Sequence, residues 1–217
     1  SPPFAAAASD VPVLGGLFQI LTVRNYDAED GQVNQHVSVP EVDAKGDLAQ
    51  QVNAEIQERV DAHLAQAQQV WEDYHDAFIA TGGTEDEWSQ REMNVDVNYE
   101  IKSQTDTTVS FVVTMTQDMF DAYNEQTYYN LDIAADKDIT LADVLGEDWV
   151  NICNAAVQTY IDQDTTGLFF SADEGGFTTV DEATSFYLNE DGSVTLVFPE
   201  YTIAAGAAGI VEIPVAG

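Results

Sequence analysis

The sequence feature that most constrains the fold is a long helical pattern between residues 47 and 83. Apolar residues recur there every three or four positions, which places them on one stripe of a helix: Val52, Ile56, Val60, Leu64, Ala67, Trp71, Tyr74 and Phe78. Asp47 is expected to cap the helix, and Thr81-Gly82-Gly83 is expected to end it. At about 1.5 Å per residue the helix approaches about 50 Å, enough to lie across a whole sheet.

Two strands are expected ahead of this helix. Residues Leu17 to Val23 form a short apolar run, and Asp30-Gly31 suits a tight turn after it. Beyond the turn, apolar and polar residues alternate from Val33 to Val39, and Pro40 is expected to end that pattern.

The clearest strand signal follows the helix. Every second residue is apolar or aromatic in two runs: Met93, Val95, Val97, Tyr99 and Ile101, and then Val109, Phe111, Val113 and Met115. This alternation predicts a hairpin with one buried face. Another strand is expected at Thr127–Ile133, followed by a short turn at Ala135–Asp138.

The C-terminal part combines a helix with further strands. Apolar residues lie at helical spacing around Cys153, and Asp191-Gly192 separates two alternating runs, which is a strong hairpin signal. Because strands flank helices without a repeating βαβ rhythm, the predicted fold class is α+β. We expect a mainly antiparallel β-sheet packed against the long helix of the N-terminal half and a shorter helix of the C-terminal half.

The length of 217 residues fits one large domain or two fused halves. Residues 1–16 are interpreted as a tether that follows a signal or anchor segment, and a frayed terminus is the alternative. Residues 17–92 form the expected N-terminal half, with two strands and the long helix. Residues 93–217 form the expected C-terminal half, with antiparallel strands and one helix, and the halves are expected to pack as one unit.

Charge excludes several kinds of partner. The chain carries 39 acidic and six basic residues, a formal net charge of −33. Such a surface repels phosphate backbones, which excludes nucleic acid and disfavours an anionic membrane surface. It would attract a cationic partner, although general solvation or adaptation to a salty habitat explains the same excess. No run of about 18 apolar residues predicts a membrane span.

The residue types that commonly perform chemistry form no recognised motif. Cys153 stands alone and is expected to be a small buried thiol. His36, His63 and His75 are expected to be solvated, because their spacing predicts no shared metal ion. The segment Asp162–Asp173 matches a calcium loop only in part, since its ninth and twelfth positions do not fit. We therefore expect no metal, no cofactor and no catalytic residue.

Three stretches in order resemble a known family. The first is a strand pair followed by DLAQQVNAEIQERVDAHL, the second is YYNLDIAADKDITLADVLGEDWVNICNAAVQTYI, and the third is TSFYLNEDGSVTLVFPEYTIAAGAAGIVEIPV. They resemble the extracytoplasmic domain family of the sigma-V anti-sigma factor, a bacterial receptor for lysozyme. Related domains occur in lipoproteins of unassigned function and beside peptidoglycan deacetylase domains.

The resemblance implies a sensing and binding module that contacts lysozyme directly. The positions that match its binding segments are Phe198, Pro199 and Tyr201, with Tyr123 and Tyr128 in the neighbouring segment Phe120–Tyr129. The family's Tyr-Glu-Ile-Ala-Pro-Tyr reads Tyr-Thr-Ile-Ala-Ala-Gly here, so a second Pro-Tyr pair is missing. From the residues alone, Pro199 and Tyr201 form either a rigid binding edge or a chain bend whose Tyr covers core.

Three functions stay open at the level of sequence. The favoured one is a non-enzymatic, extracytoplasmic sensor or ligand-binding domain of a bacterial envelope protein, secreted or anchored to the envelope. Its expected partner is a cationic protein such as lysozyme. The second is an accessory module of a cell-wall enzyme that binds peptidoglycan. The third is a hydrolase with an unrecognised pair of carboxylates, because the many acidic residues supply such pairs.

Overall fold

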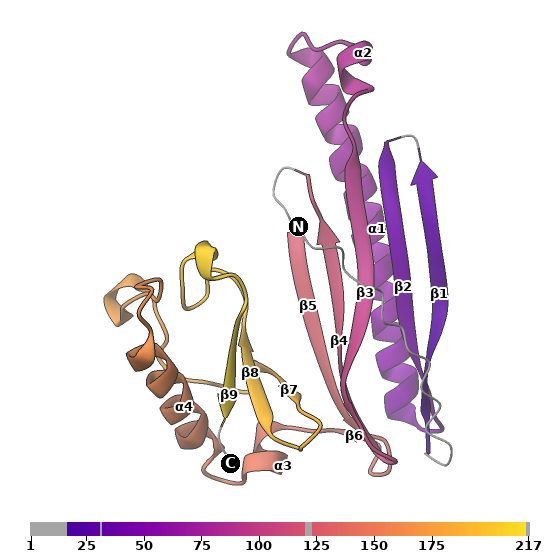
Figure 1. Cartoon of the computed structure of the whole chain (residues 1–217). Helices are drawn as coiled ribbons and strands as arrows, with labels where there is room; N and C mark the ends of the chain where they lie inside the picture. The colour runs from indigo at the N-terminus through magenta and orange to yellow at the C-terminus, as the bar shows by residue number, and fades with distance from the viewer. Residues whose placement is uncertain (1–16, 31, 120–122, 216–217) are drawn as a thin grey trace. The chain divides into compact units, whose positions relative to one another are not determined.

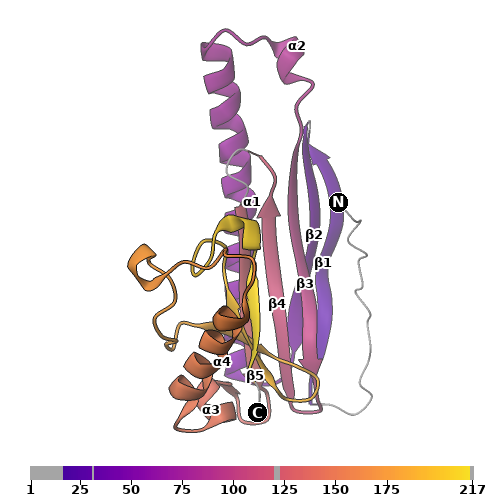
Figure 2. The same ribbon diagram turned by 60° about the vertical axis from the view of Figure 1, so that its left-hand side comes forward.

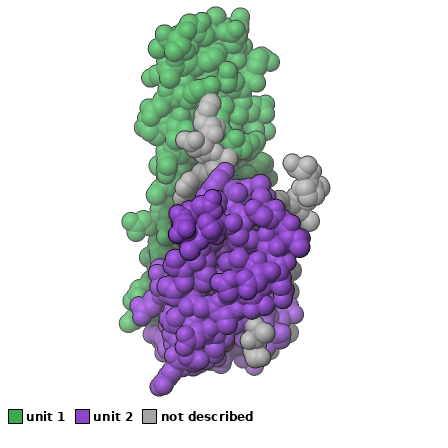
Figure 3. All heavy atoms as spheres, turned by 90° about the vertical axis from the view of Figure 1, so that its left-hand side faces the viewer, with its two compact units in different colours: residues 1–100, 112–127 green, residues 101–111, 128–217 purple. Residues whose placement is uncertain are grey.

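The computed structural model describes residues 17–30, 32–119 and 123–215, without the side chains of Asp30 and Tyr123. It divides into two compact units, shown in different colours in Figure 3. Unit 1 comprises residues 1–100 and 112–127, and unit 2 comprises residues 101–111 and 128–217. The predicted tether, residues 1–16, lies outside the described residues. The expected division at residue 92, with two halves that pack as one unit, stays a prediction.

A six-stranded sheet has the order β1-β2-β3-β4-β5-β6. Its strands are β1 (Gln19–Asp30), β2 (Val33–Asp43), β3 (Met93–Gln104), β4 (Thr108–Gln117), β5 (Tyr123–Asp132) and β6 (Lys137–Asp138). β1 pairs with β2 antiparallel, as β5 does with β6, whereas β2 and β3 are parallel. The parallel pair arises where a long helix connects β2 to β3, as parallel neighbours require a crossover. The predicted α+β class with a mainly antiparallel sheet is confirmed.

The expectation that Pro40 ends its strand is wrong, because β2 continues to Asp43. Pro40 pairs with Thr22 of β1, next to a bulge between Thr22 and Arg24. Proline, which lacks an N–H donor, is commonly placed at bulges for this reason. Pro40 also lies outside the pairing with β3, because the β2–β3 register runs only from Val33 to Val37.

Helix α1 (Asp47–Ala80) is the predicted long helix, and it runs along strands of the sheet (Figures 1 and 2). The N-cap residue is Gly46 rather than Asp47, which lies in the first turn without a capping hydrogen bond. Thr81 and Gly82, whose φ is +100°, end the helix as predicted. The short helix α2 (Glu85–Trp88) follows, with a capping box formed by Thr84 and Glu87. The described buried residues of α1 are Leu48, Ala49, Val52, Ile56, Val60, His63, Ala67 and Trp71.

The prediction that all three histidines are solvated is therefore wrong for His63. It is buried on the helix face that carries Val60 and Ala67, and its Nε2 lies 3.3 Å from the carbonyl oxygen of Thr116. Burial lowers the pKa of His63, because the charged imidazolium is less well solvated there. The exposed His36 instead pairs with Asp27 at 2.8 Å, and this hydrogen bond raises the pKa of His36.

Unit 2 contains a second, antiparallel sheet of order β7-β8-β9. Its elements are α3 (Leu141–Leu145), α4 (Trp149–Gln163), the 3-10 turns η1 (Ala172–Glu174) and η2 (Gly206–Ala208), and strands β7 (Ser185–Leu188), β8 (Val194–Phe198) and β9 (Val211–Val215). The predicted hairpin at Asp191-Gly192 is confirmed, with Gly192 at φ +81°. The predicted buried thiol of Cys153 is confirmed too: burial raises its pKa to about 11.

The predicted hairpin of β3 and β4 is confirmed at its turn, where the N–H of Thr105 donates to the carbonyl oxygen of Thr108. The expectation of one buried face is wrong for β4, because Ser110 and Val112 are buried as well as their neighbours. Ser110 donates to the Oδ1 of Asn130 at 2.6 Å and accepts from the N–H of Leu188 at 3.0 Å. A polar residue can be buried on this face because Asn130 of β5 and the backbone of Leu188 in β7 supply its hydrogen bonds.

Candidate functional site

An exposed tyrosine stands on a tight turn that follows strand β8. The carbonyl oxygen of Pro199 accepts a hydrogen bond from the N–H of Thr202 at 3.2 Å and from its hydroxyl at 2.6 Å. Tyr201, the third residue of this four-residue turn, has a φ of +64°. That position normally takes glycine or asparagine, and a bulky residue there is an outlier that costs on the order of 1–3 kcal/mol. Tyr201 nevertheless remains 71% exposed.

The ring of Tyr201 rests on the backbone of Gly206 in η2. A Cβ atom added at Gly206 would lie 2.6 Å from Cε1 of Tyr201 and would overlap the end of the ring. A glycine is therefore needed for the ring to lie where it does. Gly206 stands at the position where the family's segment has its second tyrosine, and the space above the Gly206 backbone is taken by the ring of Tyr201.

Phe198 supports the turn from the core rather than from the surface. It is buried, and its ring packs edge-to-face against Phe177 with centroids 5.7 Å apart. Of the residues expected at the binding edge, the structure therefore exposes Pro199 and Tyr201 and buries Phe198. The expectation that Phe198 contacts a ligand stays a prediction, as do those for Pro199 and Tyr201.

Tyr128 belongs to a different aromatic arrangement in unit 2. Its ring stacks on Tyr187 of β7 with centroids 5.8 Å apart and an interplanar angle of 14°. The ammonium group of Lys102 lies 4.9 Å from the centroid of the Tyr187 ring. The described ring contact of Tyr128 is therefore with β7, whereas the described contact of the Tyr201 ring is with Gly206. The side chain of Tyr123 lies outside the described residues, as does Phe120.

The segment after Tyr201 is braced by a second loop. Residues 203–205 run antiparallel to residues 168–170: the N–H of Phe170 donates to the carbonyl of Ile203 at 3.0 Å, and that of Ala205 donates to Leu168 at 2.8 Å. This short pairing fixes the chain between Tyr201 and Gly206. Sequence reasoning missed it, because neither segment alternates long enough to predict a strand.

The loop that partly matched a calcium site is closed by its own hydrogen bonds. The carboxylate of Asp164 accepts from the hydroxyl of Thr166 at 2.7 Å and from the N–H of Gly167 at 2.9 Å. The hydrogen bond from Thr166 is the main cause that lowers the pKa of Asp164. Within residues 17–30, 32–119 and 123–215, no group of three or more His, Cys, Asp and Glu side chains is arranged to hold a metal ion.

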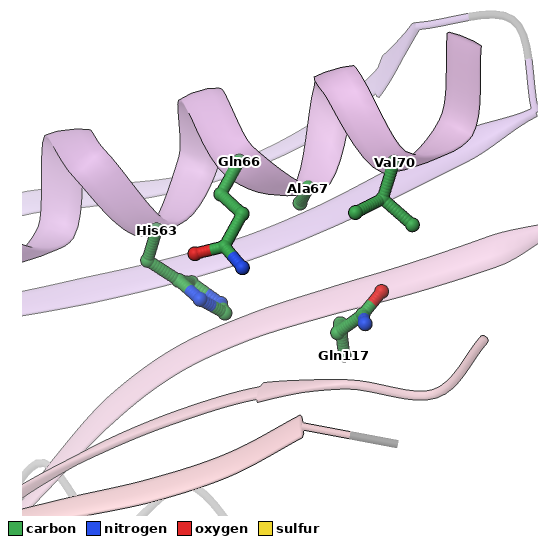
Figure 4. A pocket seen from close by; sticks show the side chains of 5 residues that line it. All are labelled: His63, Gln66, Ala67, Val70 and Gln117. Carbon is green, nitrogen blue, oxygen red and sulfur yellow. The ribbon is translucent and has the colours of Figure 1, made fainter. Parts of the chain in front are cut away.

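Figure 4 shows a small pocket between α1 and β4, lined by His63, Gln66, Ala67, Val70 and Gln117. Its volume of about 10 Å³ is close to the space that one water molecule needs. The pocket is therefore too small for an organic ligand, and the surface at Tyr201 remains the stronger candidate site.

Together these features define an acidic α+β domain that presents an aromatic side chain on a strained turn. The chain belongs to the DUF3298 family, described as a protein of unknown function, which matches residues 37–216. Anti-sigma-V factor RsiV of Bacillus subtilis (strain 168) is 21% identical over 220 residues, which cover 98% of this chain and 73% of that protein. The predicted family resemblance is thereby confirmed.

Two solved structures share the fold. A DUF3298 family member from Bacteroides fragilis has a TM-score of 0.61 at 14% identity, covering 93% of this chain and 91% of that chain. A second member, from Pseudomonas aeruginosa PAO1, has a TM-score of 0.50 at 14% identity, covering 93% and 92%. Within the described residues, no helix combines the length and apolar character needed to cross a bilayer.

Proposed function

We propose that this chain is a non-enzymatic, extracytoplasmic sensor domain of a bacterial envelope protein that binds a cationic protein. Lysozyme is the first ligand to test, because the family resemblance implies it. The similarity to an anti-sigma factor supports a sensing role outside the cytoplasm. The observation that carries the proposal is Tyr201, a mostly exposed aromatic residue held in a strained conformation.

The strain at Tyr201 points to binding because the turn itself does not require a tyrosine. A glycine would adopt a φ of +64° without cost, whereas tyrosine is strained there. Tyrosine offers a large, rigid contact area with a hydroxyl at its end, and it is enriched at the energetic centres of interfaces. Because the ring is already held on Gly206, little side-chain entropy would be lost when a partner covers it.

The charge distribution supports a cationic partner. No Lys, Arg or His occurs between residues 138 and 217, so most of unit 2 contains only acidic charges. Opposite charges accelerate encounter and disfavour acidic competitors, and salt screens this attraction. Because the Debye length falls from about 30 Å at 0.01 M to about 8 Å at 0.15 M salt, binding should weaken over that range.

The proposal is tested by calorimetry of the chain with lysozymes of several types at low and physiological salt. We expect measurable heat at low salt, an affinity that falls at least about tenfold at physiological salt, and a loss of about tenfold or more in Tyr201→Ala. The absence of heat with every lysozyme would contradict the ligand assignment. A separate experiment measures whether the chain co-sediments with purified peptidoglycan. Co-sedimentation, combined with no calorimetric heat from lysozyme, would favour the cell-wall accessory module instead.

A further inference from the structure

A second exposed tyrosine is connected to the segment after Tyr201 through one packed aromatic side chain. Within the part of unit 2 that the structure describes, the large apolar or aromatic side chains that are strongly exposed are Tyr160, at 42%, and Tyr201, at 71%. Tyr160 is in the last turn of α4, three residues after the buried Val157. A single exposed aromatic residue at the end of a helix is common and indicates no site by itself. The contacts of Tyr160 with neighbouring segments are therefore needed to assign it to a surface.

A ring contact and a backbone pairing connect Tyr160 to the segment that follows Tyr201. The ring of Tyr160 packs edge-to-face on Phe169, with centroids 5.9 Å apart. Phe169 pairs with Ala204, which lies between Tyr201 and the Gly206 backbone that carries its ring. Paired residues are about 5 Å apart and chain neighbours about 3.8 Å, so the two tyrosine rings lie within about 30 Å of each other.

This upper limit allows both tyrosines to lie within one interface. A standard protein–protein interface covers about 800 Å² on each partner, a patch about 30 Å across. Energetic hot spots within such a patch are few, and they are enriched in tyrosine and surrounded by polar side chains. Exposed carboxylates flank both tyrosines here: Asp162 follows Tyr160 by two residues, and Glu200 precedes Tyr201.

We infer that Tyr160 and Tyr201 are two anchors of one docking surface, and that its occupant is a cationic protein with basic side chains around an apolar patch. Tyr160 and Phe169 form the second half of the surface that the proposed function assigns to Tyr201, so the inference rests on that function. The acidic rim selects the partner, since the described surface from residue 138 onwards carries no basic side chain that would repel it.

The test compares Tyr160→Ala, Tyr160→Phe and Tyr201→Ala in their binding to lysozyme at low salt. We expect Tyr160→Ala to weaken binding about 5- to 30-fold and Tyr160→Phe to bind as wild type does, because the contact is made by the ring. A matched control is Tyr26→Ala in unit 1, whose hydroxyl donates to Gln35 at 3.4 Å; it should leave the dissociation constant unchanged. Circular dichroism and the thermal midpoint verify that each variant is folded.

The outcomes separate this inference from the proposed function. If wild type binds and Tyr201→Ala weakens binding while Tyr160→Ala matches Tyr26→Ala, the two-anchor surface is wrong and the proposed function stands. If wild type does not bind, the proposed function fails and the inference fails with it. If sedimentation of the chain alone shows self-association that Tyr160→Ala abolishes, the occupant is a second copy, and the inference of a cationic partner is overturned.

Discussion

The replacement Gly206→Ala separates the position of the Tyr201 ring from the stability of the fold. The new Cβ would overlap the end of the ring, 2.6 Å from Cε1, where ordinary contacts are 3.4–4 Å. The ring is the part that can move, because it belongs to a mostly exposed side chain. The backbone of Gly206 does not lie in the left-handed region, so alanine is tolerated there.

The expected change in stability of Gly206→Ala is therefore small. Alanine restricts the unfolded chain, which stabilises by about 0.4–1 kcal/mol, and displacement of the exposed ring costs a similar amount. For a chain of this size a net change below about 1 kcal/mol shifts the thermal midpoint by less than about 4 °C. Binding should suffer far more, by about 10- to 100-fold, because the anchor is no longer held in place.

Calorimetric titration with lysozyme, paired with thermal unfolding, measures both effects. Gly176→Ala is the matched control: its Cβ would overlap the backbone carbonyl of Phe170, which cannot rotate away, so this variant should lose stability. Wild-type affinity in Gly206→Ala, together with a loss in Tyr201→Ala, would refute the claim that ring placement matters. A loss of more than about 2 kcal/mol of stability in Gly206→Ala would refute the claim that the ring of Tyr201 moves aside.

Three further predictions concern the core. Because the pKa of His63 is lowered in the folded protein, the unfolded chain binds a proton there more tightly. The free energy of unfolding, measured by urea titration, should therefore fall as the pH drops below 6.5. This fall should be smaller in His63→Leu. Asn130→Leu should cost about 1–3 kcal/mol in the same assay, because Asn130 accepts from the buried hydroxyl of Ser110 at 2.6 Å and donates to the part-buried carbonyl of Phe186 at 2.9 Å. A thiol reagent should label Cys153, whose pKa is raised to about 11, only after denaturation; rapid labelling of native protein would contradict its burial.

The long helix and most strands could be predicted because their periodicity is local. Helical spacing from Val52 to Trp71 and alternation from Met93 onwards each depend on neighbours within a few residues. His63 shows the limit of the same reasoning: it lies between Val60 and Ala67 on the buried stripe, and that position could have predicted its burial. The prediction of a solvated His63 follows from its polar type, whereas its burial follows from its place in the pattern.

The candidate site was less accessible to sequence reasoning. The φ of +64° at Tyr201 breaks the ordinary preference of tyrosine, and the contact of its ring with Gly206 depends on the whole turn. The link from Tyr160 through Phe169 to Ala204 joins segments more than thirty residues apart. No local pattern encodes such a pairing. Only the family resemblance predicts that Pro199 and Tyr201 belong to a binding segment.

The most direct test of the central claim is the salt dependence of lysozyme binding to wild type and to Tyr201→Ala, measured by calorimetry at about 0.01 M and about 0.15 M salt. The account predicts binding by wild type that weakens with salt, and a loss of at least about tenfold in the variant at both concentrations, because the tyrosine contact is not ionic. Equal affinities of wild type and variant, or no binding by wild type at low salt, would contradict it.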